Sequence, residues 1–156
     1  MTLLPRKVDY ALLLLCYLRQ HPEGACARAL ADRFDLGRPF VAKILKLLCR
    51  KEFVASQRGV KGGYVLTAAA AGRSLADLLD ALDDAFFLAE CNHEAPDACC
   101  SLYERCPVKG PIAEVHRRLR GVLAATTLAD LFASGATVTG VQLDTSRCEQ
   151  AATATV

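Results

Sequence analysis

Four cysteines lie close together in the second half of the chain, in a segment without regular helical or strand periodicity. They are Cys91, Cys99, Cys100 and Cys106, all within sixteen residues. Zinc sites usually take ligands from Cys-x-x-Cys pairs, and this segment contains none. Iron–sulfur clusters accept wider spacings, because their thiolate ligands surround a larger inorganic core. The spacing therefore favours an iron–sulfur cluster, either [2Fe–2S] or [4Fe–4S], over a zinc ion.

The same residues leave two questions open. Cys99 and Cys100 are adjacent and are hard to accommodate on one cluster, so we expect three cysteine ligands, with these two competing for the middle position. A metal-free loop whose thiols oxidise reversibly is the alternative chemistry. Outside the loop, Cys16 and Cys49 fall within apolar helical patterns and are expected to be small core residues.

The elements that must position this loop begin with a helix over residues 5–20, which is apolar on nearly every side and therefore expected to be buried. A second short helix is expected over residues 26–34 and, after a tight turn, a third begins at Pro39. In the third helix, apolar residues recur at helical spacing on one side and cationic residues occupy the other. The apolar residues are Val41, Ile44, Leu45 and Leu48, and the cationic ones are Arg38, Lys43, Lys46 and Arg50. This organisation is typical of a helix-turn-helix DNA-binding motif.

Two strand-like runs, residues 53–58 and 63–67, flank a glycine-rich tip and predict a β-hairpin. A basic hairpin directly after a helix-turn-helix is the wing of a winged-helix domain. We expect Arg58 and Lys61 of the wing, together with Lys43 and Lys46, to contact phosphates of double-stranded DNA. Base edges are commonly reached from the start of the recognition helix, so Arg38, Pro39 and Phe40 are the candidates for sequence readout.

The net charge of +2 conceals two blocks of opposite sign. Residues 38–73 contain eight Lys or Arg and one acid, Glu52, whereas residues 74–104 contain eight acids and no Lys or Arg. Such a localised basic block indicates a local contact with nucleic acid. An iron–sulfur electron carrier does not need such a basic block, so this class of protein is disfavoured. An enzyme is also disfavoured, because no nucleophile–base pair, phosphate-binding loop or pair of catalytic carboxylates is evident.

The chain has 156 residues with 53% hydrophobic composition, as expected for a globular protein of one ordinary domain's length. The apolar run at residues 10–18 is interpreted as part of a buried helix, because about nine apolar residues cannot span a bilayer that requires roughly 20. We therefore expect a cytoplasmic protein without a membrane segment, in which thiols stay reduced.

The region after the wing is expected to contain the helices that assemble a dimer. Ser74 is placed to cap a helix over residues 75–82, and Thr126 or Thr127 a last short helix. Between them, a helix starting near Pro111 has a narrow apolar seam of the kind that packs against a partner helix. The seam comprises Ile112, Val115, Leu119, Val122 and Leu123. The predicted fold class is mainly α with a small β-hairpin: a winged helix-turn-helix over residues 1–73, a cysteine loop and dimerisation helices over 74–133, and a poorly ordered tail over 134–156.

Several motifs together resemble the bacterial Rrf2 family of repressors over about residues 1 to 133. The motifs are Val8-Asp9-Tyr10-Ala11, the wing from Arg58 to Leu66, Ser74-Leu75-Ala76-Asp77, the three-cysteine loop, and Thr127-Leu128-Ala129-Asp130-Leu131. The resemblance implies a dimeric winged-helix regulator. Its cysteine-bearing members, such as the IscR, NsrR and RirA types, hold an iron–sulfur cluster in this loop and respond to iron, cluster demand, nitric oxide or redox state.

The resemblance also bears on the fourth cluster ligand. Members of the IscR type have a histidine three residues after the last cysteine, where this chain has Lys109, a poor ligand. In the NsrR type a carboxylate on the first helix of the other subunit completes the cluster, and Asp9 matches it. The prediction is therefore a homodimeric, DNA-binding regulator, mostly a repressor, whose operator affinity depends on an iron–sulfur cluster held by Cys91, Cys106, Cys99 or Cys100, and Asp9. A metal-free thiol switch is the alternative.

Overall fold

The computed structural model describes residues 4–57, 63–82, 87–92 and 102–133. The helices are α1 (Arg6–Gln20), α2 (Ala27–Arg33), α3 (Arg38–Arg50), α4 (Leu75–Ala81), α5 (Lys109–Ala125) and α6 (Leu128–Phe132), with β1 (Val54–Gln57) and β2 (Gly63–Leu66) between α3 and α4. Short 3-10 turns are η1 (Ala68–Gly72), η2 (Glu90–Asn92) and η4 (Tyr103–Arg105). The mainly helical fold with one antiparallel hairpin confirms the predicted fold class.

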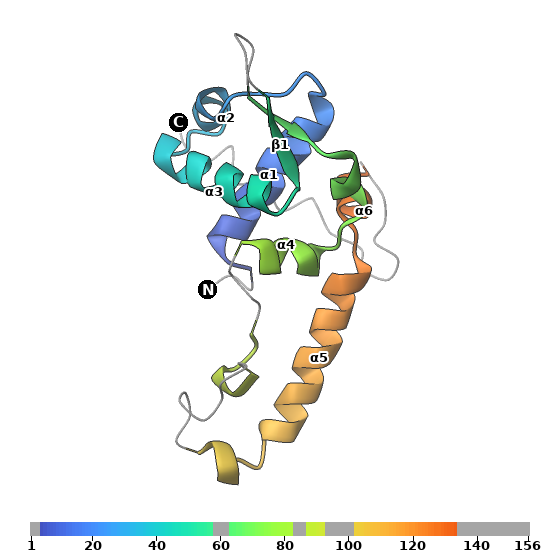
Figure 1. Cartoon of the computed structure of the whole chain (residues 1–156). Coiled ribbons are helices and arrows are strands. Elements are labelled where there is room, and N and C mark those ends of the chain that lie inside the picture. Colours follow the sequence, from blue (N-terminus) through green and yellow to red (C-terminus); the bar gives the residue numbers. More distant parts are fainter. Residues whose placement is uncertain (1–3, 58–62, 83–86, 93–101, 134–156) are drawn as a thin grey trace, which may run out of the picture.

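Most of the elements form a compact head, from which α5 extends (Figure 1). The core of the head is apolar, with no buried polar or charged residue among those the structure describes. It is built around α1, whose residues Val8, Ala11, Leu14, Leu15 and Leu18 are all buried. Phe53, at the start of the hairpin, and Leu128 of α6 are also fully buried. The continuous apolar run near the N-terminus is therefore a core helix, and no helix within the described ranges could cross a membrane.

The hairpin is fastened to the head through its second strand. β1 and β2 pair antiparallel, and Tyr64 of β2 also pairs with Ala25 through hydrogen bonds of 2.9 and 3.0 Å. The two chains approach so closely that a Cβ atom at Gly63 would lie 2.6 Å from the backbone of Ala25. Opposite it, Gly24 has a φ of 82°, which disfavours other residues. The glycines thus permit the close approach that fixes the wing beside α2.

Two capping boxes tie α4 and α6 together. Ser74 and Asp77 cap α4 reciprocally, and Thr127 and Asp130 do the same for α6. The two caps lie side by side, because the amide of Leu75 donates to the carbonyl of Thr126 at 2.9 Å. Both carboxylates accept hydrogen bonds from the cap residue, which lowers the pKa of each. The predicted cap at Ser74 is confirmed, and Thr127 rather than Thr126 caps the last helix.

Three local expectations need correction. α3 begins at Arg38, not Pro39, with Gly37 as its N-cap. α5 begins at Lys109, two residues before Pro111. Both prolines lie in the first turn, where the missing amide has no helical partner to lose, so proline does not mark the first residue. Cys16 and Cys49 are half-buried at the edge of the core rather than within it.

Candidate DNA-binding face and cysteine loop

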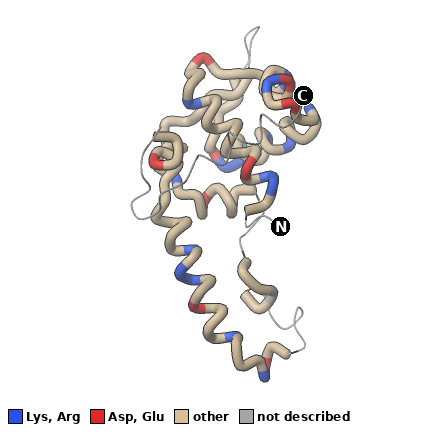
Figure 2. The backbone as a smooth tube through the Cα atoms, turned by 180° about the vertical axis from the view of Figure 1, so that it is seen from behind, with Lys and Arg blue, Asp and Glu red and all other residues tan. Residues whose placement is uncertain are grey.

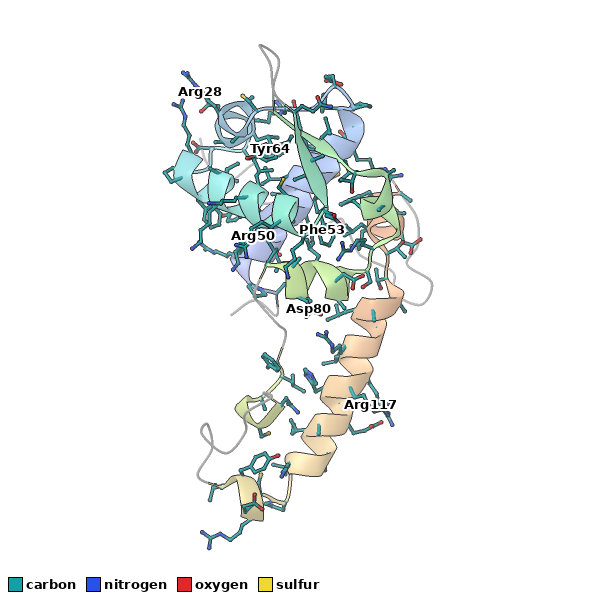
Figure 3. All side chains as sticks on the ribbon, in the orientation of Figure 1. Arg28, Arg50, Phe53, Tyr64, Asp80 and Arg117 are labelled. Carbon is teal, nitrogen blue, oxygen red and sulfur yellow. The ribbon has the colours of Figure 1, made fainter. Side chains whose placement is uncertain are left out.

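α3 presents the cationic face that the sequence predicts. Its apolar residues Val41, Ile44, Leu45 and Leu48 are completely buried, which turns Lys43, Lys46 and Arg50 to solvent. Within the described residues, no carboxylate pairs with these three cations. Arg50 of α3 and Arg28 of α2 are labelled in Figure 3. An exposed, unpaired cation retains its full charge for a polyanion, so this face of the head suits DNA phosphates.

Arg38 differs from the other cations of α3 because it has an internal partner. Its guanidinium contacts the Asp32 carboxylate of α2 at 3.1 Å, and both side chains are about half exposed, at 56% and 54%. Arg28 approaches the same carboxylate at 3.9 Å. Among the described residues, Arg38 is therefore an ion-paired cation, unlike Lys43, Lys46 and Arg50. Asp32 was missed by the sequence reasoning, although its i,i+4 spacing from Arg28 is a recognisable ion-pair signal.

The other two candidates for sequence readout occupy different environments. Pro39 is exposed, whereas Phe40 is half-buried and meets Tyr10 of α1 edge to face, with ring centroids 5.5 Å apart. Phe40 thus helps to set the angle between α3 and α1. A role for either residue in contacting bases stays a prediction.

Arg73, the last member of the basic block, has a structural role. Its guanidinium stacks over the Phe53 ring, 4.3 Å from the centroid, and donates to the Lys51 carbonyl at 2.9 Å. It joins the end of α3 to the start of α4 and is not free for phosphate. Arg58 and Lys61, at the wing tip, lie outside the described residues.

Basic residues also occur along α5, as Figure 2 shows from behind. Its three arginines form ion pairs with carboxylates. Glu114 contacts both Arg117 and Arg118 at 2.7 Å, and these bonds lower the pKa of Glu114. Arg120 meets Asp80 of α4 at 2.6 Å, which raises the pKa of Arg120 and fastens α5 to the head. The three arginines of α5 are therefore paired with carboxylates, whereas Lys43, Lys46 and Arg50 of α3 have no such partner among the described residues.

The apolar residues of α5 fall into two stripes. Leu119 and Leu123 pack against the core of their own chain, and Ile112 is half-buried. Val108, Val115 and Val122 recur every seven residues and are 57%, 45% and 59% exposed. The sequence placed Leu119 and Leu123 in the same seam as the valines. The structure separates them: Leu119 and Leu123 pack against the core, whereas the valines are exposed.

The described segment at the start of the cysteine loop, η2, lies beside the part of α5 that extends from the head (Figure 1). Cys91, in η2, and Cys106, just after η4, are both half-buried free thiols. Cys99 and Cys100 lie outside the described residues. The side-chain oxygen of Asn92, next to Cys91, is buried and has no hydrogen-bond partner among the residues that the structure describes, which is costly for an unpaired polar atom. Two softly ligating thiols at the ends of one loop fit an iron–sulfur cluster by their chemistry.

Asp9 lies in the head, apart from these thiols. It is exposed on α1 beside an apolar groove of about 420 Å³, lined by Leu12, Leu13, Cys16, Leu131 and Phe132. Among the described residues, no three His, Cys, Asp or Glu side chains come together as a metal site. Asp9, Cys91 and Cys106 therefore do not form a three-residue site within the described part of the chain.

The fold can now be compared with known protein families. The Rrf2 family profile, described as an iron-dependent transcriptional regulator, matches residues 4–134. The chain belongs to the Rrf2 family of transcriptional regulators.

Three known proteins show what the chain is similar to. The HTH-type transcriptional regulator NsrR of Oceanobacillus iheyensis is 28% identical over 131 residues, covering 83% of this chain and 88% of its own. The T. potens IscR structure aligns with a TM-score of 0.63 at 22% identity, covering 90% and 93%. The structure of CymR, the global cysteine regulator of B. subtilis, aligns with a TM-score of 0.60 at 22% identity, covering 86% and 98%. The two structural likenesses concern the winged-helix fold alone.

Proposed function

We propose that this protein is a homodimeric, DNA-binding transcriptional regulator whose operator affinity is controlled by an iron–sulfur cluster in the loop over residues 91–106. One observation carries the proposal. The segments that contain the half-buried thiols Cys91 and Cys106 adjoin α5, and exposed valines on α5 offer a surface to a second chain. The proposed cluster ligands therefore lie close to the proposed dimer surface.

DNA contact is assigned to the unpaired face of α3. Lys43 and Lys46 neutralise phosphates, and Arg50 extends the same cationic surface. Arg38, at the helix start, contributes to base readout once it leaves or shares Asp32. Replacing Arg38 by Ala should therefore reduce discrimination among operator sequences more than it reduces overall affinity.

Cys91 and Cys106 are proposed as obligatory ligands, with Cys99 or Cys100 between them and Asp9 of the partner subunit completing the set. The bound cluster would supply the reactivity toward oxygen or nitric oxide, and its assembly would depend on the supply of iron. The chain supplies strong thiolate ligands and one weaker, more exchangeable carboxylate. Because α1 belongs to the DNA-binding head, a ligand from it would link the loop of one subunit directly to the head of the other.

Coupling to DNA follows from dimer geometry. The two heads must read half-sites about 34 Å apart, so a small change in their spacing loses the contacts of one head. We expect tighter binding with the cluster, because an ordered loop holds the heads in one register. Typical coupling between two sites would change operator affinity by roughly 5 to 150-fold.

The test begins with anaerobic purification, an absorption spectrum, and iron and sulfide assays. Under anaerobic reconstitution, Cys91→Ala or Cys106→Ala should retain little cluster, whereas Asp9→Ala should form a cluster that decays faster than in the wild type. Affinity for a DNA duplex selected from random sequence by the cluster-bound protein is then measured for both forms at one salt concentration. Equal affinities would show that the metal site has no sensing role.

A metal-free thiol switch is the second candidate, because Cys91 and Cys106 are both free, half-buried thiols that could oxidise. Its thiols would oxidise reversibly to a disulfide, with the electrons passing to an oxidant such as a peroxide. Full cluster occupancy in Cys91→Ala and in Cys106→Ala would show that these thiols are not the obligatory ligands and leave them for redox chemistry. The absence of iron from anaerobically purified protein would favour the metal-free switch directly.

A further inference from the structure

The two ends of the cysteine loop are attached to one side of α5. Before the loop, the Leu88 amide donates to Nδ1 of His116 at 3.4 Å, and the Phe87 ring stacks on the His116 ring at 6.0 Å and 9°. After the loop, Nζ of Lys109 lies over the Tyr103 ring, 3.2 Å from its centroid. At each end, an aromatic residue next to the cysteine segment, Phe87 or Tyr103, contacts a polar side chain of the helix.

Lys109 and His116 are seven residues apart, which places them on one side of the helix, about two turns or 10.5 Å along its axis. Leu123, a further seven residues on, packs against the core of its own head. The side of α5 that holds the loop is therefore continuous with the side that holds the head.

The exposed valine stripe runs beside this side. Val108 immediately precedes Lys109, and Val115 immediately precedes His116, so each attachment point is about 100° around the helix from an exposed valine. The position of the loop thus bears directly on the edge of the surface offered to a second chain.

We propose that His116 is a positioning residue that docks the Cys91 segment onto α5, and that Lys109 docks the Cys106 segment on the same side, so that the helix sets the separation of the two thiols. The proposal rests on the function proposed above for the regulatory role of the loop. It assigns Lys109, which stands where the IscR type has a ligand, a structural contact with Tyr103.

The test measures thiol reactivity in the reduced, cluster-free protein. A short pulse of iodoacetamide is quenched, and alkylation at Cys91 and Cys106 is quantified separately by mass spectrometry. In His116→Ala, loss of the hydrogen bond and the ring contact should speed alkylation of Cys91 by about fivefold and leave Cys106 unchanged. His116→Asn should return Cys91 to within about twofold of the wild type, because Oδ1 of Asn occupies the place of Nδ1 and accepts from the Leu88 amide.

The reciprocal variant provides the second arm. Lys109→Met should speed alkylation of Cys106 and not of Cys91, whereas Lys109→Arg should preserve the contact with the Tyr103 ring. Arg117→Ala, next to His116 but paired only with Glu114, is the matched control and should change neither rate. Thermal unfolding by circular dichroism verifies that every variant retains its fold.

An unchanged Cys91 rate in His116→Ala, or an equal rise at both thiols in every variant, would overturn the docking. So would a failure of His116→Asn to restore protection. The two proposals fail separately. Selective alkylation in a protein that never binds iron would retain the docking and refute the cluster, whereas normal cluster assembly without selective alkylation would do the reverse.

Discussion

Lys46 on α3 offers a sharp test of the DNA-binding face, because its charge is exposed and has no partner among the described residues. A lysine that neutralises one phosphate releases about one counterion from DNA, contributing about 0.9 to the slope of log affinity against log salt. Lys46→Ala should therefore lower the magnitude of that slope by about 0.9. The loss of affinity should be about 3.5 times larger at about 50 mM than at about 200 mM salt.

The assay is fluorescence anisotropy with a labelled duplex across that salt range. Arg117→Ala removes the same charge from α5, where Glu114 already pairs with it, and should leave the slope unchanged. Asp32→Asn should act in the opposite direction to Lys46→Ala. It frees Arg38 from a half-exposed ion pair of about 0.2 to 1 kcal/mol, which corresponds to a rise in affinity of up to about fivefold.

Refutation would come from a wild-type slope in Lys46→Ala, or from equal effects of Lys46→Ala and Arg117→Ala. The first result would remove α3 from the DNA interface. The second would mean that binding reflects overall charge and not the unpaired face of this helix.

Three further predictions address the fold and assembly. Gly63→Ala should destabilise the protein by about 1 to 3 kcal/mol in denaturant titration, because its Cβ would clash with Ala25, and unchanged stability would disprove the close approach. Asp77→Asn should cost about 1 kcal/mol at neutral pH. Hydrogen bonds from the Ser74 backbone and hydroxyl lower the Asp77 pKa. The ionised carboxylate therefore stabilises the fold at pH values above its ordinary pKa, and this stabilisation is lost as the pH falls through the lowered pKa. In acid titration, the free energy of unfolding should depend less on pH in the variant than in the wild type. Val122→Asp should shift the protein toward monomer in analytical ultracentrifugation without lowering the unfolding temperature of the head, and a persistent dimer would exclude the valine stripe as the interface.

Local patterns in the sequence were sufficient for the elements of this protein. Apolar spacing in α3 predicted which residues are buried, and Ser74 before an apolar helical run predicted the N-cap of α4, because both signals depend on neighbours within one or two helical turns. The glycine-flanked basic runs predicted the wing. Family motifs spread along the chain indicated the fold as a whole, and the family match bears this out.

Tertiary structure decided which of the predicted residues are exposed and unpaired, and so able to contact DNA or a second chain. Arg38 and Lys46 read alike as exposed cations of one helix, yet only Arg38 meets Asp32, because α2 brings that carboxylate to one end of α3. Leu119 and Val115 read alike as members of one seam, but only Leu119 contacts the core.

The attachment of the cysteine loop to His116 had no sequence signal at all. It joins Leu88 to a residue 28 positions away, and the spacing of two such residues follows from the path of the chain between them. Periodicity reports what lies on one face of a single element. Which faces meet depends on how the elements pack, and that is determined by the burial of the whole core.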